Sequence, residues 1–244
     1  MWGYLVAILS FTFTAVHLLL HFRRTKLRSI VSKYKEVLLV FAHPDDETMF
    51  FLPLILTLQT VQVRVRLLCL STGNYDGMGP VRVQELQAVG RALGALSCDI
   101  VDEPKLPDGP HAWLSEVVAS TVRQYLVGHS KVSAIFTFDN YGVSGHPNHV
   151  SVERGMRELV RSKGCSTPVF SLKSVSIWRK YLPVVDGLVT LLWSSSDTLL
   201  AVNVWDPMKA VKLMRLYGSQ NVWFRKLFSV FSKYSYTNEF EQLA

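Results

Sequence analysis

Apolar runs of strand length, each ending abruptly in polar residues, constrain the fold of this chain more than any other feature. Residues 37–41 read Val-Leu-Leu-Val-Phe and are followed at once by Ala-His-Pro-Asp-Asp-Glu. A continuous apolar run of this length is typical of a strand buried on both faces, as in a parallel sheet. Residues 134–138 form a second apolar run, which ends in Asp-Asn-Tyr-Gly. We therefore expect a parallel sheet with polar clusters at its strand ends.

Segments with helical patterns separate the predicted strands. Further strands are expected near residues 63–70, 99–101, 169–177 and 198–204, and helices over 81–93, over 113–127, from Pro147, and from Pro207 with Asp206 as its cap. Alternating strands and helices predict a Rossmann-like α/β fold, in which helices cover both faces of a mostly parallel sheet. Ligands of such sheets bind beyond the carboxyl ends of the strands, where both polar clusters fall.

The chain begins with a long stretch that carries no charge. Residues 2–22 contain no Asp, Glu, Lys or Arg, and six basic residues follow within residues 23–35. A run of roughly 20 apolar residues is long enough to cross a bilayer core. Positive charge behind the run favours a retained, single-pass anchor with the rest of the chain in the cytoplasm. We therefore predict a transmembrane helix over residues 1–22, a basic connector over 23–35 and a catalytic domain over 36–244.

Composition narrows the classes of function. Hydrophobic residues make up 49% of the chain and charged residues 18%, which excludes intrinsic disorder. The net charge of +7 suits either nucleic acid or anionic lipid. Lipid is favoured, because basic residues crowd behind the apolar stretch and no nucleic-acid-binding motif is found. Cys69, Cys98 and Cys165 have no metal-ligand spacing and indicate reduced thiols in a reducing compartment.

Two polar clusters contain the residue types that bind metals. The first is His-Pro-Asp-Asp-Glu at residues 43–47, and the second is His-Pro-Asn-His at residues 146–149. Histidine nitrogen combined with carboxylate oxygen suits zinc. Catalytic zinc takes three protein ligands and keeps one position open for water. His43, Asp46 and His149 can supply those three ligands.

Residues beside these ligands are candidates for proton transfer. Asp45 would be free to accept a proton from a water whose pKa the metal lowers to roughly 7. His146 could donate a proton or stabilise an oxyanion. The same clusters also fit a polar binding pocket without metal, in which the acids cap a helix. Asp139 and Asn140 either bind substrate, orient a zinc-bound histidine or simply end a strand.

Taken together, Ala-His-Pro-Asp-Asp-Glu and Ser-Gly-His-Pro-Asn-His resemble the N-acetylglucosaminyl-phosphatidylinositol de-N-acetylases, the PIG-L family, and more widely the LmbE-like deacetylases. The resemblance continues in order through residues 71–75, Arg82 and Glu85, and residues 137–145, 174–181 and 219–226. It implies zinc, or another divalent metal, bound by His43, Asp46 and His149. It also implies Asp45 as general base, His146 as acid or oxyanion stabiliser, and Arg82 near the sugar.

The resemblance further implies a reaction and a place. Members of this family remove the acetyl group of N-acetylglucosaminyl-phosphatidylinositol, the second step of glycosylphosphatidylinositol-anchor biosynthesis, on the cytoplasmic face of the endoplasmic reticulum. A glycolipid substrate and membrane lipid are therefore the expected partners, and nucleic acid is not.

One segment departs from the family pattern. Members of the family carry a histidine just before a Ser-Gln pair, whereas residues 215–220 here contain none. Tyr217 either substitutes for that histidine or packs in the core. The missing histidine leaves one alternative open, an impaired, membrane-tethered protein that binds sugar lipid. A separate alternative is a deacetylase of the same fold that acts on a soluble sugar conjugate. The aromatic and basic residues over 223–233 predict either a helix at a membrane interface or a terminal helix packed on the core.

Overall fold

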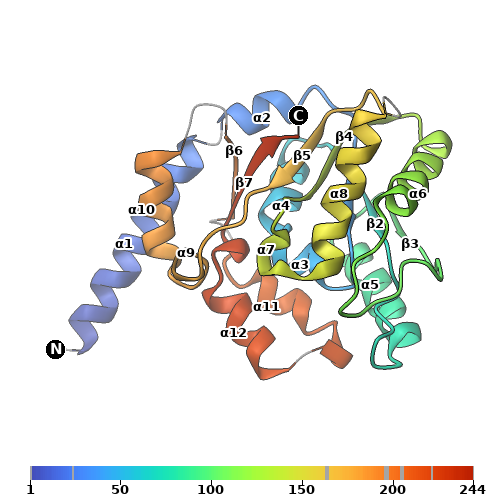
Figure 1. Ribbon diagram of the computed structural model, residues 1–244. Coiled ribbons are helices and arrows are strands. Elements are labelled where there is room, and N and C mark those ends of the chain that lie inside the picture. Colours follow the sequence, from blue (N-terminus) through green and yellow to red (C-terminus); the bar gives the residue numbers. More distant parts are fainter. Residues whose placement is uncertain are drawn as a thin grey trace.

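A single sheet of seven strands, in the order β3-β2-β1-β4-β5-β7-β6, organises the molecule (Figure 1). The computed structural model describes residues 2–23, 25–162, 165–194, 198–203, 206–220 and 222–243. The parallel strands are β1 (Glu36–Phe41), β2 (Arg64–Cys69), β3 (Ser97–Ile100), β4 (Val132–Phe138) and β5 (Val169–Leu172). Strand β7 (Thr237–Gln242) runs antiparallel to both β5 and β6 (Leu199–Val202).

Strand β1 lies between β2 and β4, and all six of its residues are buried. Its apolar side chains meet both layers of helices, which is why the run contains no alternation of polar and apolar residues. Its one charged residue, Glu36, lies at the first position. The Glu36 carboxylate accepts hydrogen bonds from Arg64 at 2.7 Å and Arg66 at 2.9 Å. Polar groups are therefore confined to the two ends of this strand.

Helices cover both faces of the sheet (Figure 1). On one face, α8 (Pro147–Arg161) contacts β1, β4 and β5, and α6 (Ser115–Gly128) packs on α8. Elsewhere α4 (Leu52–Thr60) contacts β2, β6 and β7, and α5 (Gly79–Ala92) contacts β3. The other helices are α1 (Trp2–Arg23), α2 (Thr25–Val31), α3 (Asp46–Phe50), α7 (Gly142–Gly145), α9 (Ile177–Tyr181), α10 (Pro183–Trp193), α11 (Lys209–Met214) and α12 (Trp223–Phe231).

The mostly parallel sheet with helices on both faces confirms the predicted α/β architecture. Two details differ. Strand β5 ends at Leu172, well short of the predicted residue 177, and the chain then leaves the sheet toward α9. Helix α11 begins at Lys209, so the cap predicted at Asp206 is wrong; its carboxylate pairs instead with Lys212 at 3.1 Å. Position 204, the predicted end of the strand near β6, lies outside the described residues.

The structure does not support the predicted transmembrane anchor over residues 1–22. A helix does form there, α1, but among the described residues no helix is both long and apolar enough to cross a membrane. The second half of α1 packs on protein, since Val16 and Leu20 are buried against Leu200 and Val202 of β6. Helix α2, within the predicted connector, likewise buries Leu27 and Val31 in the core.

A buried ion network attaches α9 and α10 to the sheet. The Lys233 ammonium is fully buried and lies 2.8 Å from Glu239 of β7 and 3.2 Å from Asp186 of α10. Arg179 of α9 contacts the same two acids at 3.1 and 2.7 Å. Burial alone would raise the pKa of Glu239, but the Lys233 charge outweighs burial and lowers it. Two positive and two negative charges balance, so the network tolerates burial only as a complete set.

Replacing Lys233 with methionine should destabilise the protein strongly. The change leaves two buried carboxylates facing one guanidinium, and breaking a buried pair typically costs about 3–5 kcal/mol. Lys212→Met is the matched control, because it removes an exposed pair with Asp206 that is worth at most about 1 kcal/mol. Urea unfolding of both variants measures the difference. Equal free energies of unfolding for the two variants would contradict the structural role of the network.

Candidate functional site

A cavity of about 610 Å³ opens beyond the carboxyl ends of β1 and β4. These neighbouring strands mark the point where the strand order reverses, which is the usual ligand crevice of doubly wound sheets. The cavity volume falls within the roughly 300–1,000 Å³ of small-molecule sites. Polar residues that line it include His43, Asp45, Asp46, Arg82, Asp108, His146, His149, Lys180 and Arg225.

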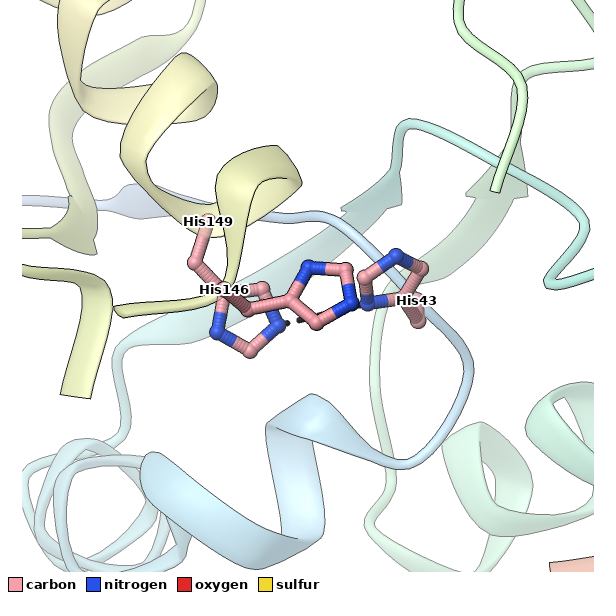
Figure 2. A group of neighbouring side chains, drawn as sticks. All are labelled: His43, His146 and His149. Atoms are coloured by element: carbon pink, nitrogen blue, oxygen red, sulfur yellow. Dashed lines mark hydrogen bonds between the residues drawn. The ribbon is translucent and has the colours of Figure 1, made fainter. Parts of the chain in front are cut away.

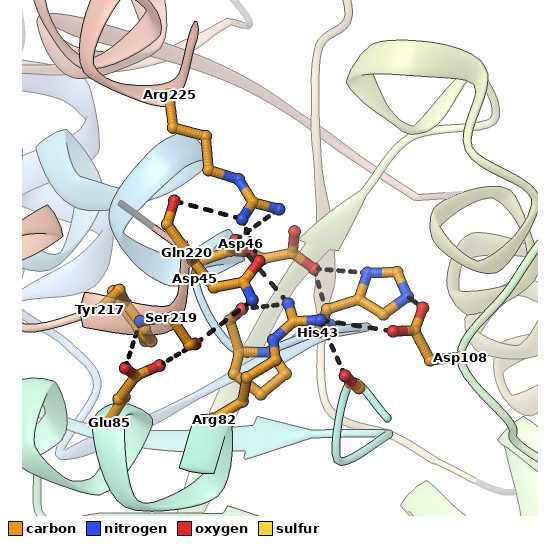
Figure 3. Close-up of polar contacts among 12 residues, drawn as sticks. His43, Asp45, Asp46, Arg82, Glu85, Asp108, Tyr217, Ser219, Gln220 and Arg225 are labelled. Atoms are coloured by element: carbon orange, nitrogen blue, oxygen red, sulfur yellow. Dashed lines mark hydrogen bonds and ion pairs between the residues drawn. The ribbon is translucent and has the colours of Figure 1, made fainter. Parts of the chain in front are cut away.

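The His43 ring, which follows β1, is held from one side (Figure 3). Its Nε2 lies 3.1 Å from Asp108 Oδ1 and 2.9 Å from Asn148 Oδ1. Both partners are acceptors, so Nε2 carries a hydrogen, and Nδ1 presents a lone pair to the cavity in the neutral ring. Burial alone would lower the pKa of His43, but Asp108 and Asp46 outweigh it and raise the pKa. The surroundings of this ring therefore favour positive charge.

His149 lies in the first turn of α8 and is oriented in the same way. Its Nδ1 donates to the Gly142 carbonyl at 3.0 Å, and the ring stacks on Phe138 with centroids 4.3 Å apart. Asp139 holds the turn at Gly142 in place. Its carboxylate accepts hydrogen bonds from the Gly142 amide at 2.9 Å and from the Ser174 hydroxyl at 2.6 Å. These contacts leave His149 Nε2 as the free nitrogen, and it points into the cavity.

Three potential ligand atoms converge at the cavity floor. His149 Nε2 lies 3.2 Å from Asp46 Oδ1 and 3.2 Å from His43 Nδ1, and His43 Nδ1 lies 3.7 Å from Asp46 Oδ2. Tetrahedral ligands at about 2.0–2.1 Å from zinc would be separated by about 3.4 Å. Burial would raise the pKa of Asp46, but His149 and His43 outweigh it and lower the pKa. A cation between these atoms would neutralise the carboxylate and occupy both lone pairs, so this set fits a metal.

His146 approaches the same point from the amino terminus of α8 (Figure 2). One nitrogen from each of His43, His146 and His149 lies within 4.8 Å of the other two, so this cluster could also hold a metal. His146 Nδ1, however, accepts from the Asn148 amide at 3.3 Å, which places the hydrogen of the neutral ring on Nε2. Burial and the two neighbouring histidines lower the pKa of His146 to about 4. Its geometry therefore favours donation of a hydrogen over metal binding.

Asp45 occupies the most strained backbone position of the site. Its φ is 110°, in the left-handed region that favours glycine, and such strain concentrates at functional sites. Its Oδ2 lies 3.1 Å from Arg225 of α12 and 3.8 Å from Arg82 of α5. Among the described residues this buried oxygen has no hydrogen-bond donor of good geometry. Burial raises the pKa of Asp45 to about 6, against the lowering effect of Arg225 and Arg82.

Arg82 is fixed by backbone oxygens. Its guanidinium donates to the carbonyls of Gly73 at 2.9 Å and Pro44 at 2.8 Å, while lining the cavity.

Glu47 is fully buried and does not line the cavity. Its carboxylate accepts from Thr48 at 2.6 Å and from the Tyr217 hydroxyl at 2.8 Å. Burial raises the pKa of Glu47 to about 7.

Tyr217 packs in the core, which was one of the two alternatives predicted from the sequence. The side chain is fully buried and is not among the residues that line the cavity. Its hydroxyl supports the first polar cluster through Glu47, from 170 positions further along the chain. Tyr217 therefore does not take the place of the missing histidine in the cavity.

The structure brings together His43, Asp45, Asp46, Arg82, His146 and His149 as predicted neighbours. It does not bring Asp139 and Asn140 into this cavity; they line an adjoining hollow of about 520 Å³. Sequence reasoning missed Asp108, the acceptor of His43, and Arg225, the partner of Asp45. Asp108 stands in an irregular loop without a motif, and Arg225 was read only as part of a basic aromatic segment. Asn148 was seen inside the second cluster but given no role.

Comparisons with known proteins agree with this geometry. Residues 38–160 match the family described as "PIG-L: GlcNAc-PI de-N-acetylase". The chain is 37% identical over 213 residues to the probable N-acetylglucosaminyl-phosphatidylinositol de-N-acetylase of Schizosaccharomyces pombe, covering 84% of this chain and 85% of that protein. It is 38% identical over 208 residues to the corresponding enzyme of Bos taurus, covering 82% and 81%.

Solved structures share the fold. The N,N'-diacetylchitobiose deacetylase from Pyrococcus horikoshii superposes with a TM-score of 0.60 at 16% identity, covering 87% of this chain and 85% of that one. GalB, the 4-carboxy-2-hydroxymuconate hydratase from Pseudomonas putida, superposes with a TM-score of 0.55 at 13% identity, covering 86% and 96%. One is a deacetylase and the other a hydratase, so these likenesses show the fold and not the reaction.

Gly142→Ala should weaken metal binding, because Gly142 leaves no room for a side chain. Its φ is +61°, and an added Cβ would lie 2.5 Å from His149 Cβ. Gly94→Ala is the matched control: its φ is +59°, and nothing lies within 4 Å of an added Cβ. Both variants carry the backbone cost of a positive φ, about 1 kcal/mol, but only the first displaces His149. Titration with zinc should show at least about tenfold weaker binding for Gly142→Ala alone. Equal affinities would contradict the claim that the turn positions His149.

Proposed function

Since the chain belongs to the N-acetylglucosaminyl-phosphatidylinositol de-N-acetylase family, we propose that it hydrolyses the acetamide of N-acetylglucosaminyl-phosphatidylinositol to glucosaminyl-phosphatidylinositol and acetate. The observation that carries this proposal is the convergence of His43 Nδ1, His149 Nε2 and the Asp46 carboxylate at 3.2–3.7 Å beside Asp45. The names of the relatives support this substrate. The family resemblance of the two motifs carries the proposed role as the second step of glycosylphosphatidylinositol-anchor biosynthesis.

His43, Asp46 and His149 would hold one divalent cation, which we take to be zinc because two imidazoles and one carboxylate suit it. A zinc ion there would supply a Lewis acid for the acetamide oxygen and a water that ionises near neutral pH. Asp108, Asn148 and the Gly142 carbonyl would orient the two imidazoles through their other nitrogens.

Asp45 would accept the proton of the attacking water. Its buried Oδ2 has no hydrogen-bond donor among the described residues, and Arg225 and Arg82 lie 3.1 and 3.8 Å from this same oxygen and restrain the carboxylate. A general base must lie within hydrogen-bond reach of the proton it takes, and its place next to Asp46 provides that reach. The amide carbon gains an oxygen from water and loses its bond to nitrogen, so one proton must reach the leaving amine.

His146 would deliver that proton or stabilise the oxyanion. In the neutral ring its hydrogen lies on Nε2, because Nδ1 accepts from a backbone amide. Arg82, fixed at the cavity wall, would contact the sugar, and Asp139 would act by positioning His149 through the Gly142 turn. Asn140 remains a predicted substrate contact of the adjoining hollow.

We place this activity at the endoplasmic reticulum membrane, on its cytoplasmic side. The family resemblance implies this organelle. Cys69, Cys98 and Cys165 are all free, as is usual in a reducing compartment. Tyr217 does not line the cavity and so does not substitute for the missing histidine, and the assay below decides between a working enzyme and an impaired binding protein.

A deacetylation assay tests the reaction and its metal. Protein purified without added metal should contain about one zinc per chain and release acetate from N-acetylglucosaminyl-phosphatidylinositol. A chelator should abolish the release, and added zinc should restore it. Full activity without stoichiometric metal would refute the metal site. A zinc-loaded protein that leaves this lipid intact but deacetylates a soluble sugar conjugate would refute the substrate.

Asp45→Asn and Asp46→Asn should separate proton transfer from metal binding. Asp45→Asn should retain zinc and lose about 10²–10⁴-fold in turnover, since that is the usual worth of positioned proton transfer. Asp46→Asn should instead lose zinc, because it removes the anionic ligand. Zinc content and deacetylation rate are measured together for both variants. Loss of zinc from Asp45→Asn with retention in Asp46→Asn would reverse the two assignments, and a near-normal rate in Asp45→Asn would make another group the base.

A further inference from the structure

Helix α10 has its polar and apolar faces reversed. Its buried residues include Asp186 and Thr190, which join the ion network with Arg179 and Glu239. Its outer face carries Leu192, 70% exposed, and Trp193, 74% exposed. A helix on the surface of a soluble protein normally shows the opposite arrangement. An apolar surrounding on the outer side would explain why the polar residues turn inward.

Neighbouring helices extend this apolar surface. Helix α9, which contacts both α10 and α12, exposes Trp178 at 75%. Helix α12 exposes Trp223 at 73%, with Phe224 and Phe231 beside it. The three helices lie along the same side of the molecule in Figure 1. We refer to the exposed residues Trp178, Leu192, Trp193, Trp223, Phe224 and Phe231 of these three helices collectively as the aromatic face. Soluble monomers rarely leave so many large apolar side chains together in water.

The charges around the aromatic face are positive. Helices α9, α10 and α12 contain four basic residues and a single acid, Asp186; Asp186 and Arg179 pair with each other, Arg225 pairs with Asp45, and two lysines remain outside ion pairs among the described residues. Among the basic residues, Lys226 is exposed beside Trp223 and Phe224. Tryptophan and phenylalanine interleaved with lysine and arginine are typical of surfaces that lie in the interfacial layer of a bilayer. The positive charge complements anionic phospholipid more specifically than it complements an unknown protein.

The aromatic face reaches the mouth of the catalytic cavity. Tyr181 of α9 and Phe224 and Phe228 of α12 line the cavity, as do Lys180 and Arg225 from the same two helices. A glycolipid lying in a bilayer against this surface would meet the cavity without leaving the membrane. This step rests on the proposed function, because it takes the substrate to be a lipid.

We propose that the aromatic face docks in the plane of a bilayer that contains anionic phospholipid, so that the cavity mouth lies against the headgroup layer. Docking of this kind immerses side chains about 5–10 Å deep and does not cross the membrane. The buried network of Lys233, Asp186 and Glu239 holds α9 and α10 in the orientation that presents the aromatic residues.

Vesicle binding by the full chain tests this proposal. The test variant combines Trp178→Ser, Trp193→Ser and Trp223→Ser, none of which lines the catalytic cavity. The control combines Leu96→Ser, Leu114→Ser and Val127→Ser, exposed apolar residues on or beside α5 and α6, on the other side of the molecule. The vesicles contain phosphatidylcholine alone or equimolar phosphatidylcholine and phosphatidylinositol. Partitioning of the test variant into the mixed vesicles should fall by about tenfold or more, since even one large apolar side chain is worth that much when immersed. The control should partition like the unaltered protein.

Charge and oligomeric state complete the test. Lys226→Glu should reduce binding to the mixed vesicles and leave the weaker binding to phosphatidylcholine unchanged. Wild-type partitioning by the tryptophan variant would overturn the proposal. It would also be overturned if the unaltered protein is dimeric and the tryptophan variant monomeric without lipid, because a second copy would then cover the face.

Activity separates failure of docking from failure of the proposed function. The tryptophan variant should deacetylate the lipid substrate in vesicles slowly, but should retain its rate on N-acetylglucosaminyl-inositol phosphate without acyl chains. If the unaltered protein hydrolyses neither compound, the proposed function fails while vesicle binding still decides docking. If it hydrolyses both and the tryptophan variant shows no selective loss in vesicles, docking fails and the proposed function stands.

Discussion

The burial of β1 on all sides is the constraint on which the rest of the structure depends. A strand enclosed between β2 and β4 and between two helical layers has no place for a polar side chain along its length. Every group that can perform chemistry is therefore displaced to the carboxyl end, where His43, Asp45 and Asp46 follow within a few residues. Because β4 lies directly beside β1, the polar residues that follow β4 arrive at the same edge. The cavity is thus a consequence of how this sheet excludes water.

At that edge, each proposed ligand is aimed by a contact on its far side. Asp108 and Asn148 occupy one nitrogen of His43, the Gly142 carbonyl occupies one nitrogen of His149, and the remaining nitrogens face each other across 3.2 Å. Two lone pairs and a carboxylate at such distances repel one another unless positive charge lies between them. The pKa of His43 is raised and the pKa of Asp46 is lowered, so both shifts favour a positive charge on the imidazole beside the carboxylate. In the absence of a metal, a proton supplies that charge.

Sequence reasoning could predict those parts of the site that are local in the chain. The apolar run before His43 predicted the central strand of the sheet. The first polar cluster and the two histidines before and within α8 predicted the residues of the cavity floor. Asp108 stands in an irregular loop without a motif, and Arg225 stands in a predicted helix whose sequence does not show which acid it faces, so neither partner could be predicted. Strand β7 was missed for a related reason: it returns antiparallel between β5 and β6, and its Glu239 is a buried charge that only Lys233 and Arg179 make tolerable. The uncharged first segment predicted a membrane span, which the described helices do not support.

The hydrogen bond between Glu47 and Tyr217 joins residues 170 positions apart, and Arg225 reaches Asp45 from still nearer the end of the chain. During synthesis the strand before the first cluster emerges early. Tyr217, the partner of the buried Glu47 carboxylate, is translated 170 residues later. Until then a hydrophobic strand and an unpaired acid remain exposed together in a partly folded chain, the kind of intermediate that chaperones commonly protect. The catalytic motif alone therefore does not make the catalytic centre, because its buried acids depend on partners from segments far along the chain.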